Sequence, residues 1–162
     1  MDGISEILAT YNCVSLDEKI QFELDGVVEK EIKQAYCIEN LEFCVSCMDY
    51  TTLKVSDTEE SVKNFTADLL KKLKKFNLRD VAAVCVFSNY AGIVREGLKG
   101  TEIQTAVVAG NFPNSQTFTE IKLAECKMAS GAGAQEVDVV ISVGDILEKN
   151  YEKVYRELKA IR

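Results

Sequence analysis

The chain has 162 residues, of which 47% are apolar and 28% charged, a balance typical of a soluble globular domain rather than a disordered chain. Its net charge of −7 and pI near 4.8 argue against a nucleic acid or an anionic membrane as partner, because both need a basic surface. The sequence contains no histidine, which excludes catalytic triads and histidine general bases.

The first residues, MDGISEIL, are acidic where a secretory signal would be basic, and no apolar run approaches the roughly 20 residues that span a bilayer. We therefore expect a cytoplasmic protein with reduced cysteines. Cys44 and Cys47 form a C-x-x-C motif, but we expect them inside a strand, where residues i and i+3 point to opposite faces. Packing is therefore favoured over a redox or zinc site, and we expect no metal.

The first 40 residues contain two stretches in which apolar residues follow helical spacing, and we expect an N-terminal helical extension there. The apolar residues are Ile4, Ile7, Leu8 and Tyr11 in the first stretch, and Val27, Val28, Ile32, Ala35 and Tyr36 in the second. A different pattern begins after residue 40, so we divide the chain into segments 1–40 and 41–162.

Within residues 41–162, strand patterns and helix patterns alternate four times. We expect strands over 43–49, 81–87, 103–109 and 136–143, and helices that begin near residues 56, 89, 117 and 150. The sequences SDTE (56–59) and TFTE (117–120) are expected to be capping boxes for two of these helices. Such alternation predicts right-handed crossovers and an α/β fold with a parallel sheet covered by helices.

The fourth expected strand, EVDVVISV, contains an aspartate in its middle. The strand period of two places the apolar residues 137, 139, 141 and 143 on one face and Asp138 on the other. We expect the apolar face to meet the helices and Asp138 to be buried opposite, where an unpaired carboxylate is costly. Asp49 lies near the carboxyl end of the first strand, and ligand sites of α/β proteins form at that end of parallel strands. Both aspartates are therefore candidate site residues, although either would also fit a simple role as an acceptor of backbone hydrogen bonds.

Four short motifs accompany the expected strands in chain order: DYTTL (49–53), AVCVF (83–87), GNFPNSQT (110–117) and EVDVV (136–140). In this order and spacing they resemble the motifs of deoxyribose-phosphate aldolases, which are of the types DLTTL, AxCVYP, GFPxGQ and E[IV]D[IV]V. The resemblance extends from about residue 43 to the end of the sequence. It departs from the family pattern at Phe87-Ser88, where the family often has Tyr-Pro, and at Asn111 and Ser115, near positions usually held by glycine.

The resemblance implies a TIM (β/α)8-barrel fold. It also implies the reversible cleavage of 2-deoxy-D-ribose 5-phosphate to D-glyceraldehyde 3-phosphate and acetaldehyde through a lysine Schiff base, without metal or other cofactor. Carried over by motif, the resemblance implies that Asp138 relays protons through water. It further implies that Asp49, Thr51 and Cys85 support the substrate site.

A TIM barrel has eight β-α units, and this sequence supplies about four, after the N-terminal helical segment. In the family that it resembles, the Schiff-base lysine lies on strand six, a second lysine on strand seven, and the phosphate loops follow strands seven and eight. We therefore expect those parts to be missing from this chain and the chain alone to be inactive. No lysine falls inside an expected strand, and Lys54, after the first strand, is nearest to the expected site.

Half a barrel would expose two unpaired strand edges, which we expect to favour self-association or pairing with a complementing C-terminal half. Two other interpretations stay open. The chain would also fit a non-catalytic half-barrel that acts as a binding or interaction protein, or an open doubly wound sheet with an unrelated ligand. The sequence contains no G-x-G-x-x-G or Walker loop to support the doubly wound sheet. Its GAG at 131–133 precedes an expected strand rather than a helix, which is the wrong place for a phosphate-binding loop.

Overall fold

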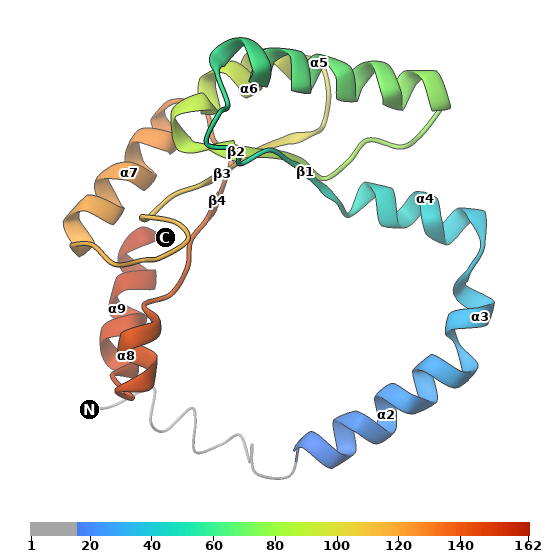
Figure 1. The fold of residues 1–162 in the computed structure, drawn as a ribbon, viewed down its shortest axis with the longest axis horizontal. Coiled ribbons are helices and arrows are strands. Elements are labelled where there is room, and N and C mark those ends of the chain that lie inside the picture. Colours follow the sequence, from blue (N-terminus) through green and yellow to red (C-terminus); the bar gives the residue numbers. More distant parts are fainter. Residues whose placement is uncertain (1–15) are drawn as a thin grey trace. The chain divides into compact units, whose positions relative to one another are not determined.

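The first described elements are helices. The computed structural model describes residues 16–162. These residues belong to two units, and the boundary in the sequence falls between residues 41 and 42. In the first unit, α2 (Leu16–Lys30) and α3 (Ile32–Ala35) are separated at Glu31 (Figure 1). The helical pattern expected at residues 27–36 is therefore present but interrupted, and the pattern at residues 4–11 lies outside the described residues.

Helix α4 (Ile38–Ser46) occupies most of the segment where a first strand was expected, so the prediction of a strand over 43–49 is wrong. The first strand, β1 (Asp49–Thr51), begins at the last residue of that range. A short apolar run fits a buried strand and a helix face equally well, and here Ile38, Leu41 and Val45 follow the i, i+3, i+7 spacing of a helix.

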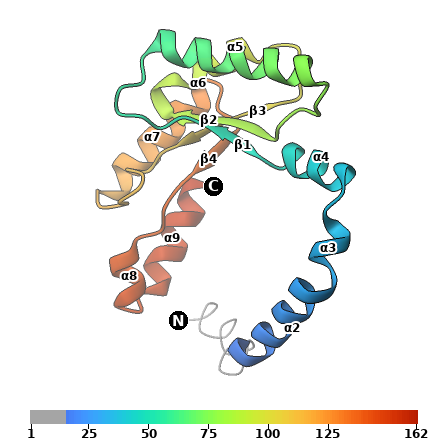
Figure 2. The ribbon, with the colours of Figure 1, turned by 45° about the vertical axis from the view of Figure 1, so that its right-hand side comes forward.

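A four-stranded parallel sheet forms the centre of the second unit, with strand order β1-β2-β3-β4. The remaining strands are β2 (Ala83–Phe87), β3 (Gln104–Val108) and β4 (Glu136–Asp138). Between and after them lie α5 (Glu59–Phe76), the 3₁₀ helix η2 (Ser88–Tyr90), α6 (Ala91–Gly97), α7 (Thr119–Gly131), α8 (Val143–Leu147) and α9 (Tyr151–Ile161) (Figure 2). The predicted alternation and the predicted parallel sheet are confirmed.

Strand β4 ends at Asp138 rather than at Val143 as expected. Its length depends on its neighbour, because β3 ends at Val108 and the last backbone bond between the two segments joins Ala109 N to Asp138 O at 3.0 Å. Gly110, with φ of 69°, then turns the chain away from the sheet. Residues beyond 138 have no strand to pair with there, and Val143 begins a helix instead.

Both expected capping boxes are wrong in detail. Helix α5 does begin with a capping box, but Thr58 and Ser61 form it rather than the ends of residues 56–59. Thr58 Oγ1 accepts from Ser61 N at 3.1 Å, and Thr58 N donates to Ser61 Oγ at 2.8 Å. Helix α7 begins after Phe118 without a side-chain cap. A serine can thus replace the expected Glu at the third helical position, which shifts the box by two residues.

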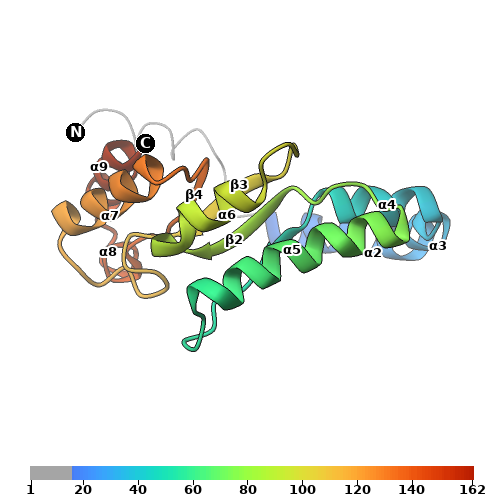
Figure 3. The same cartoon turned by 90° about the horizontal axis from the view of Figure 1, so that it is seen from above.

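The main core lies between the sheet and helices α5, α6 and α7, and α5 and α6 are side by side over it (Figure 3). Its buried members include Val62, Leu69, Leu73, Val84, Val86, Val94, Leu98, Ile103, Val107 and Ala129. The other face of the sheet carries a smaller cluster of Ala83, Cys85, Ala106 and Val108, against which Leu53, Phe87 and Phe112 pack. We call this second face the open face. None of the helices between residues 16 and 162 has the length and apolarity needed to cross a membrane.

We expect Leu98→Ala to lower the free energy of unfolding by about 2–5 kcal/mol, because the side chain is fully buried in the main core and its removal leaves a cavity. Urea denaturation followed by circular dichroism measures the change. Leu147→Ala is the matched control, since Leu147 is 78% exposed and its loss should cost less than about 0.5 kcal/mol. Equal losses in the two variants would contradict this assignment of the core.

Candidate active site on the open face of the sheet

The alternation of side chains along β1 separates its residues between the two faces of the sheet. Tyr50 faces the helices and stacks on Phe65 of α5, with ring centroids 4.3 Å apart. Asp49 and Thr51 therefore lie on the open face. The register places Thr51 beside Cys85 of β2, so the first two motifs meet on this face.

Cys85 also reaches the fourth motif. Its thiol donates to Asp138 Oδ2 with a sulfur–oxygen distance of 3.6 Å, although β3 lies between β2 and β4. The β3 residue in register with Cys85 is Ala106, whose methyl group leaves room for the two longer side chains to meet above it. The structure thus brings Cys85, Asp138, Asp49 and Thr51 together on the open face. The expectation that Asp49 lies near the carboxyl end of its strand is wrong, because Asp49 begins β1 and is in register with Ala83, the first residue of β2.

The electrostatics of Cys85 reflect these neighbours. Its side chain is only 3% exposed, and burial, followed by the charge and hydrogen bond of Asp138 and the charge of Asp49, raises the pKa of Cys85 to about 12. A hydrogen bond from Thr51 acts weakly in the opposite direction on this pKa. The thiol therefore stays protonated at neutral pH, so it can orient Asp138 as a donor but is no nucleophile.

The prediction that Asp138 is buried is wrong, because both Asp138 and Asp49 are exposed. Val137, the neighbour of Asp138, packs against the main core, so Asp138 does point away from the helices as expected. The partly buried hydrophobic residues that pack against the open-face cluster are Leu53, Phe87 and Phe112. Solvent therefore reaches both carboxylates.

Lysine is the nucleophile that an aldolase of this type needs, and the lysines of this chain lie in two different settings. Lys54 is exposed in the loop after β1, where its backbone N–H donates to Asp57 Oδ2 at 2.9 Å. Of the lysines whose side chains the structure describes, only Lys122 of α7 is buried. The sequence patterns above did not predict this burial, although helical spacing places Lys122 on the same face as Cys126 and Ala129.

Besides Gly110, the loop that carries the third motif has two non-glycine residues in the left-handed region, Asn111 with φ of 60° and Ser115 with φ of 57°. This conformation favours glycine, which explains why the motifs usually have glycine near these positions. Glu125 of α7 binds the loop, since Asn111 N donates to its Oε2 at 3.0 Å. Its Oε1 accepts from Ser88 Oγ at 2.9 Å. The carboxylate of Glu125 therefore binds both Ser88 and Asn111, two positions at which the sequence departs from the family motifs.

The C-x-x-C motif lies at the end of α4 and not in a strand, so the argument that its sulfurs diverge is wrong. Cys47 N donates to Cys44 O at 3.1 Å in the closing turn, and both side chains are exposed. Within residues 16–162, no group of three or more His, Cys, Asp or Glu side chains is arranged to hold a metal ion.

We expect Asp138→Asn to lower the pKa of Cys85 from about 12 toward its ordinary value of 9.0, because the change removes the nearest negative charge. The pH dependence of Cys85 alkylation, followed by peptide mapping, measures this pKa. Asp68→Asn on the exposed side of α5 is the control and should leave it unchanged. An identical Cys85 titration in Asp138→Asn would contradict the contact.

The same raised pKa makes stability depend on pH. Between about pH 9 and pH 12 the unfolded chain releases the Cys85 proton while the folded chain keeps it, so the free energy of unfolding falls as pH rises through this range. Below that range the contribution is fully present. Cys85→Ala should therefore flatten this part of the stability curve in urea denaturation, and a parallel decline in both proteins would contradict the assignment.

Comparison with known proteins supports the resemblance seen in the motifs. No family model matches the chain. The deoxyribose-phosphate aldolase of Clostridium novyi is 40% identical over 114 residues, which cover 70% of this chain and 48% of that protein. The deoxyribose-phosphate aldolase of Clostridium tetani is 38% identical, and the match covers 70% of this chain and 49% of that protein. The deoxyribose-phosphate aldolase of Streptococcus sanguinis is 34% identical, and the match covers 70% of this chain and 48% of that protein.

Solved structures give the same result for the fold. A protein from Coccidioides immitis assigned as a deoxyribose-phosphate aldolase superposes with a TM-score of 0.65 and 27% identity, covering 75% of this chain and 45% of that one. The deoxyribose-phosphate aldolase from Aeropyrum pernix gives a TM-score of 0.58 and 28% identity, with 74% and 46% covered. The four parallel βα units therefore match about half of these barrels. The chain spans about half the length of the curated relatives that it matches. Over the matched region, it is homologous to the deoxyribose-phosphate aldolases.

Proposed function

We propose that the chain forms the first half of a deoxyribose-phosphate aldolase barrel and supplies the proton-transfer side of the site. The reaction is the reversible cleavage of 2-deoxy-D-ribose 5-phosphate to D-glyceraldehyde 3-phosphate and acetaldehyde through a lysine Schiff base. One observation carries the proposal. Cys85 and Asp138, from the motifs of two non-adjacent strands, meet at 3.6 Å on the open face, beside Asp49 and Thr51.

Asp138 has the role of proton relay in this proposal. Carbinolamine formation, dehydration and carbon–carbon cleavage each move a proton, and a carboxylate open to solvent can pass protons through a bound water. Cys85 donates to one carboxylate oxygen of Asp138 and leaves the other available for water. Asp49 adds negative charge near this pair, and Thr51 supplies a hydroxyl beside Cys85.

The nucleophile, in this proposal, comes from residues outside the 162-residue sequence. Lys54 is exposed in a loop, whereas Lys122 is bound by Glu157 and Ser115 on the flank of α7. A Schiff-base lysine needs a free amine in a desolvated site. Lys122 lacks the first because Ser115 and Glu157 bind its amine, and the exposed Lys54 lacks the second. We therefore propose that this chain by itself has negligible aldolase activity.

The free edges of the sheet define the partner that we propose. In the described part of the chain, β1 pairs only with β2 and β4 only with β3, so each has one free edge. Free edges of parallel strands pair readily with other strands. We propose that these edges bind either a second copy of the chain or a complementing C-terminal half, and that the completed site binds a small sugar phosphate.

Borohydride trapping tests the proposed division of the site. With deoxyribose 5-phosphate and sodium borohydride, we expect the intact mass of the purified chain to show no reduced covalent adduct. The Clostridium novyi relative, treated in parallel, is the positive control. An adduct on the chain would contradict the proposal, and Lys54→Met would then show whether Lys54 is the reacting lysine.

Reconstitution tests the role of Asp138. The chain is mixed with the part of the Clostridium novyi relative that lies C-terminal to the matched region, and we expect trapping and turnover to appear. In that complex, Asp138→Asn should lower kcat by about 10²–10⁴-fold, the usual contribution of a general acid or base. Asp68→Asn is the control. Binding of the sugar phosphate without turnover in the wild-type complex would instead favour a non-catalytic binding protein.

The free edges predict an association that depends on concentration. In sedimentation equilibrium we expect an average mass above the 18.0 kDa of the monomer, rising with protein concentration. A concentration-independent monomer with sharp, cooperative unfolding would contradict the proposed use of the edges.

A further inference from the structure

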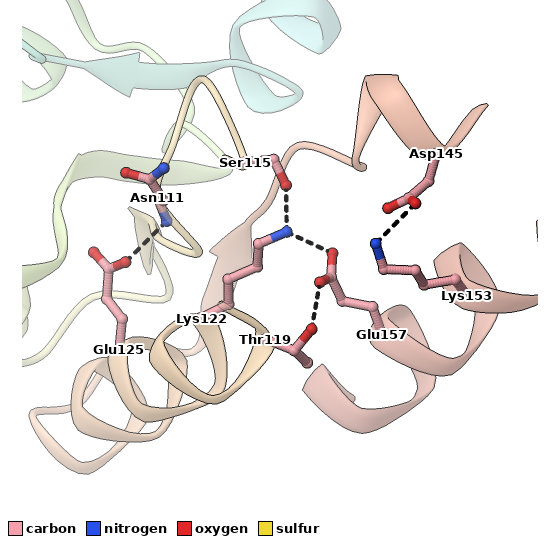
Figure 4. Close-up of polar contacts among 8 residues, drawn as sticks. All are labelled: Asn111, Ser115, Thr119, Lys122, Glu125, Asp145, Lys153 and Glu157. Carbon is pink, nitrogen blue, oxygen red and sulfur yellow. Dashed lines mark hydrogen bonds and ion pairs between the residues drawn. The ribbon is translucent and has the colours of Figure 1, made fainter. Parts of the chain in front are cut away.

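The loop between β3 and α7, residues 109–118, is fixed at two points by side chains of α7 (Figure 4). Glu125 accepts from Asn111 N at 3.0 Å, and Lys122 Nζ donates to Ser115 Oγ at 2.7 Å. Asn111 and Ser115 are the two non-glycine residues of the loop with positive φ, a conformation that is unfavourable for residues with a Cβ. The two contacts therefore hold the loop in a shape that its own backbone preferences do not favour.

Lys122 also connects this loop to the last helix. Its Nζ lies 2.7 Å from Glu157 Oε1 of α9, and the two side chains are only 3% and 10% exposed. The second oxygen of Glu157 accepts from Thr119 Oγ1 at 3.0 Å. Figure 4 shows Lys122 between Ser115 and Glu157, with the neighbouring pair Lys153 and Asp145 separate from it. One buried lysine thus joins α9, α7 and the loop.

The loop itself borders the candidate site. Phe112 packs against the cluster on the open face that contains Cys85 and Val108. Ala109 N donates to Asp138 O at 3.0 Å, so the start of the loop is bonded to the strand that carries the proposed proton relay. A shift of the loop would therefore change the cover of Cys85 and the surroundings of Asp138.

We propose that Lys122 is a positioning residue: neutralised by Glu157, it fixes the loop through Ser115 and so holds Phe112 against the open-face cluster that contains Cys85. Its importance for aldolase chemistry rests on the proposed function. Its effect on the loop does not, because cover of Cys85 is measurable without any substrate. Helix α9, far from the open-face residues in sequence, is then part of what shapes the site.

The buried ion pair between Lys122 and Glu157 is expected to determine the position of the loop rather than to stabilise the fold. A buried ion pair is often no more stabilising than a well-packed apolar pair of similar volume, whereas loss of one partner alone leaves an uncompensated charge. Apolar residues at 122 and 157 would still pack but would make no hydrogen bond to Ser115. The double variant Lys122→Met/Glu157→Leu is therefore expected to keep its fold and to release the loop.

Alkylation of Cys85 tests the proposal. The rate of Cys85 modification at a fixed pH is measured by mass-spectrometric peptide mapping, with the exposed Cys44 and Cys47 in the same sample as internal references. We expect the double variant to raise the Cys85 rate by about tenfold or more through local opening of the loop, with an unchanged urea midpoint. Lys153→Met, which breaks the ion pair between α9 and α8, is the control and should leave the Cys85 rate unchanged.

Ser115→Ala provides a second test in case the double variant does not fold. It removes only the hydroxyl that Lys122 binds and leaves the ion pair with Glu157 intact, and Ser130→Ala on the exposed part of α7 is its matched control. Faster Cys85 modification in Ser115→Ala, but not in Ser130→Ala, would support the proposal. Unchanged Cys85 modification in Ser115→Ala would overturn it, whatever the outcome of the aldolase assays.

Discussion

The arrangement of this chain depends on the burial of one side of a parallel sheet. Val84, Val86 and Val107 are completely buried beneath α5, α6 and α7. Because successive strand residues alternate between faces, this burial forces Cys85 to the opposite side. Parallel strands joined by crossover helices also place all their carboxyl ends at one edge. Packing of the core therefore brings Cys85 and Asp138 together, although 53 positions separate them in the sequence.

The two faces of the sheet consequently have different physical properties. The helix-covered face is filled by large apolar side chains, while the open face carries small ones and two carboxylates in contact with solvent. Among the described residues, no lysine or arginine forms an ion pair with Asp49 or Asp138. Burial and the negative charges of these two carboxylates together raise the pKa of Cys85. A cationic group brought to this face would be attracted by both carboxylates.

Sequence patterns predicted most of the βα order but not every boundary. Strands with strong apolar runs, such as the one containing Val84 and Val86, and the apolar face of α5 were found because burial fixes their periodicity. The segment that contains Cys44 was misassigned because a short apolar run fits both periods. The end of β4 at Asp138 depends on where β3 ends, and the exposure of Asp138 depends on which other strands surround the sheet. Neither is encoded in the local sequence. The motifs did identify side chains that meet in space, whereas Lys122 lies in none of them, and its burial depends on Glu157 of another helix, 35 positions away.

The pairing of Lys122 with Glu157 also limits which substitutions at these two positions can accumulate during evolution. Loss of either partner alone leaves a buried charge, at a cost of about 3–5 kcal/mol. That is a large part of the roughly 5–15 kcal/mol by which domains are usually stable. Replacement of both partners by apolar residues costs little, so single-step intermediates are disfavoured while the double replacement is tolerated. The two positions are therefore expected to be inherited as a linked pair, and a lineage that loses the pair would have to find another way to hold the β3–α7 loop.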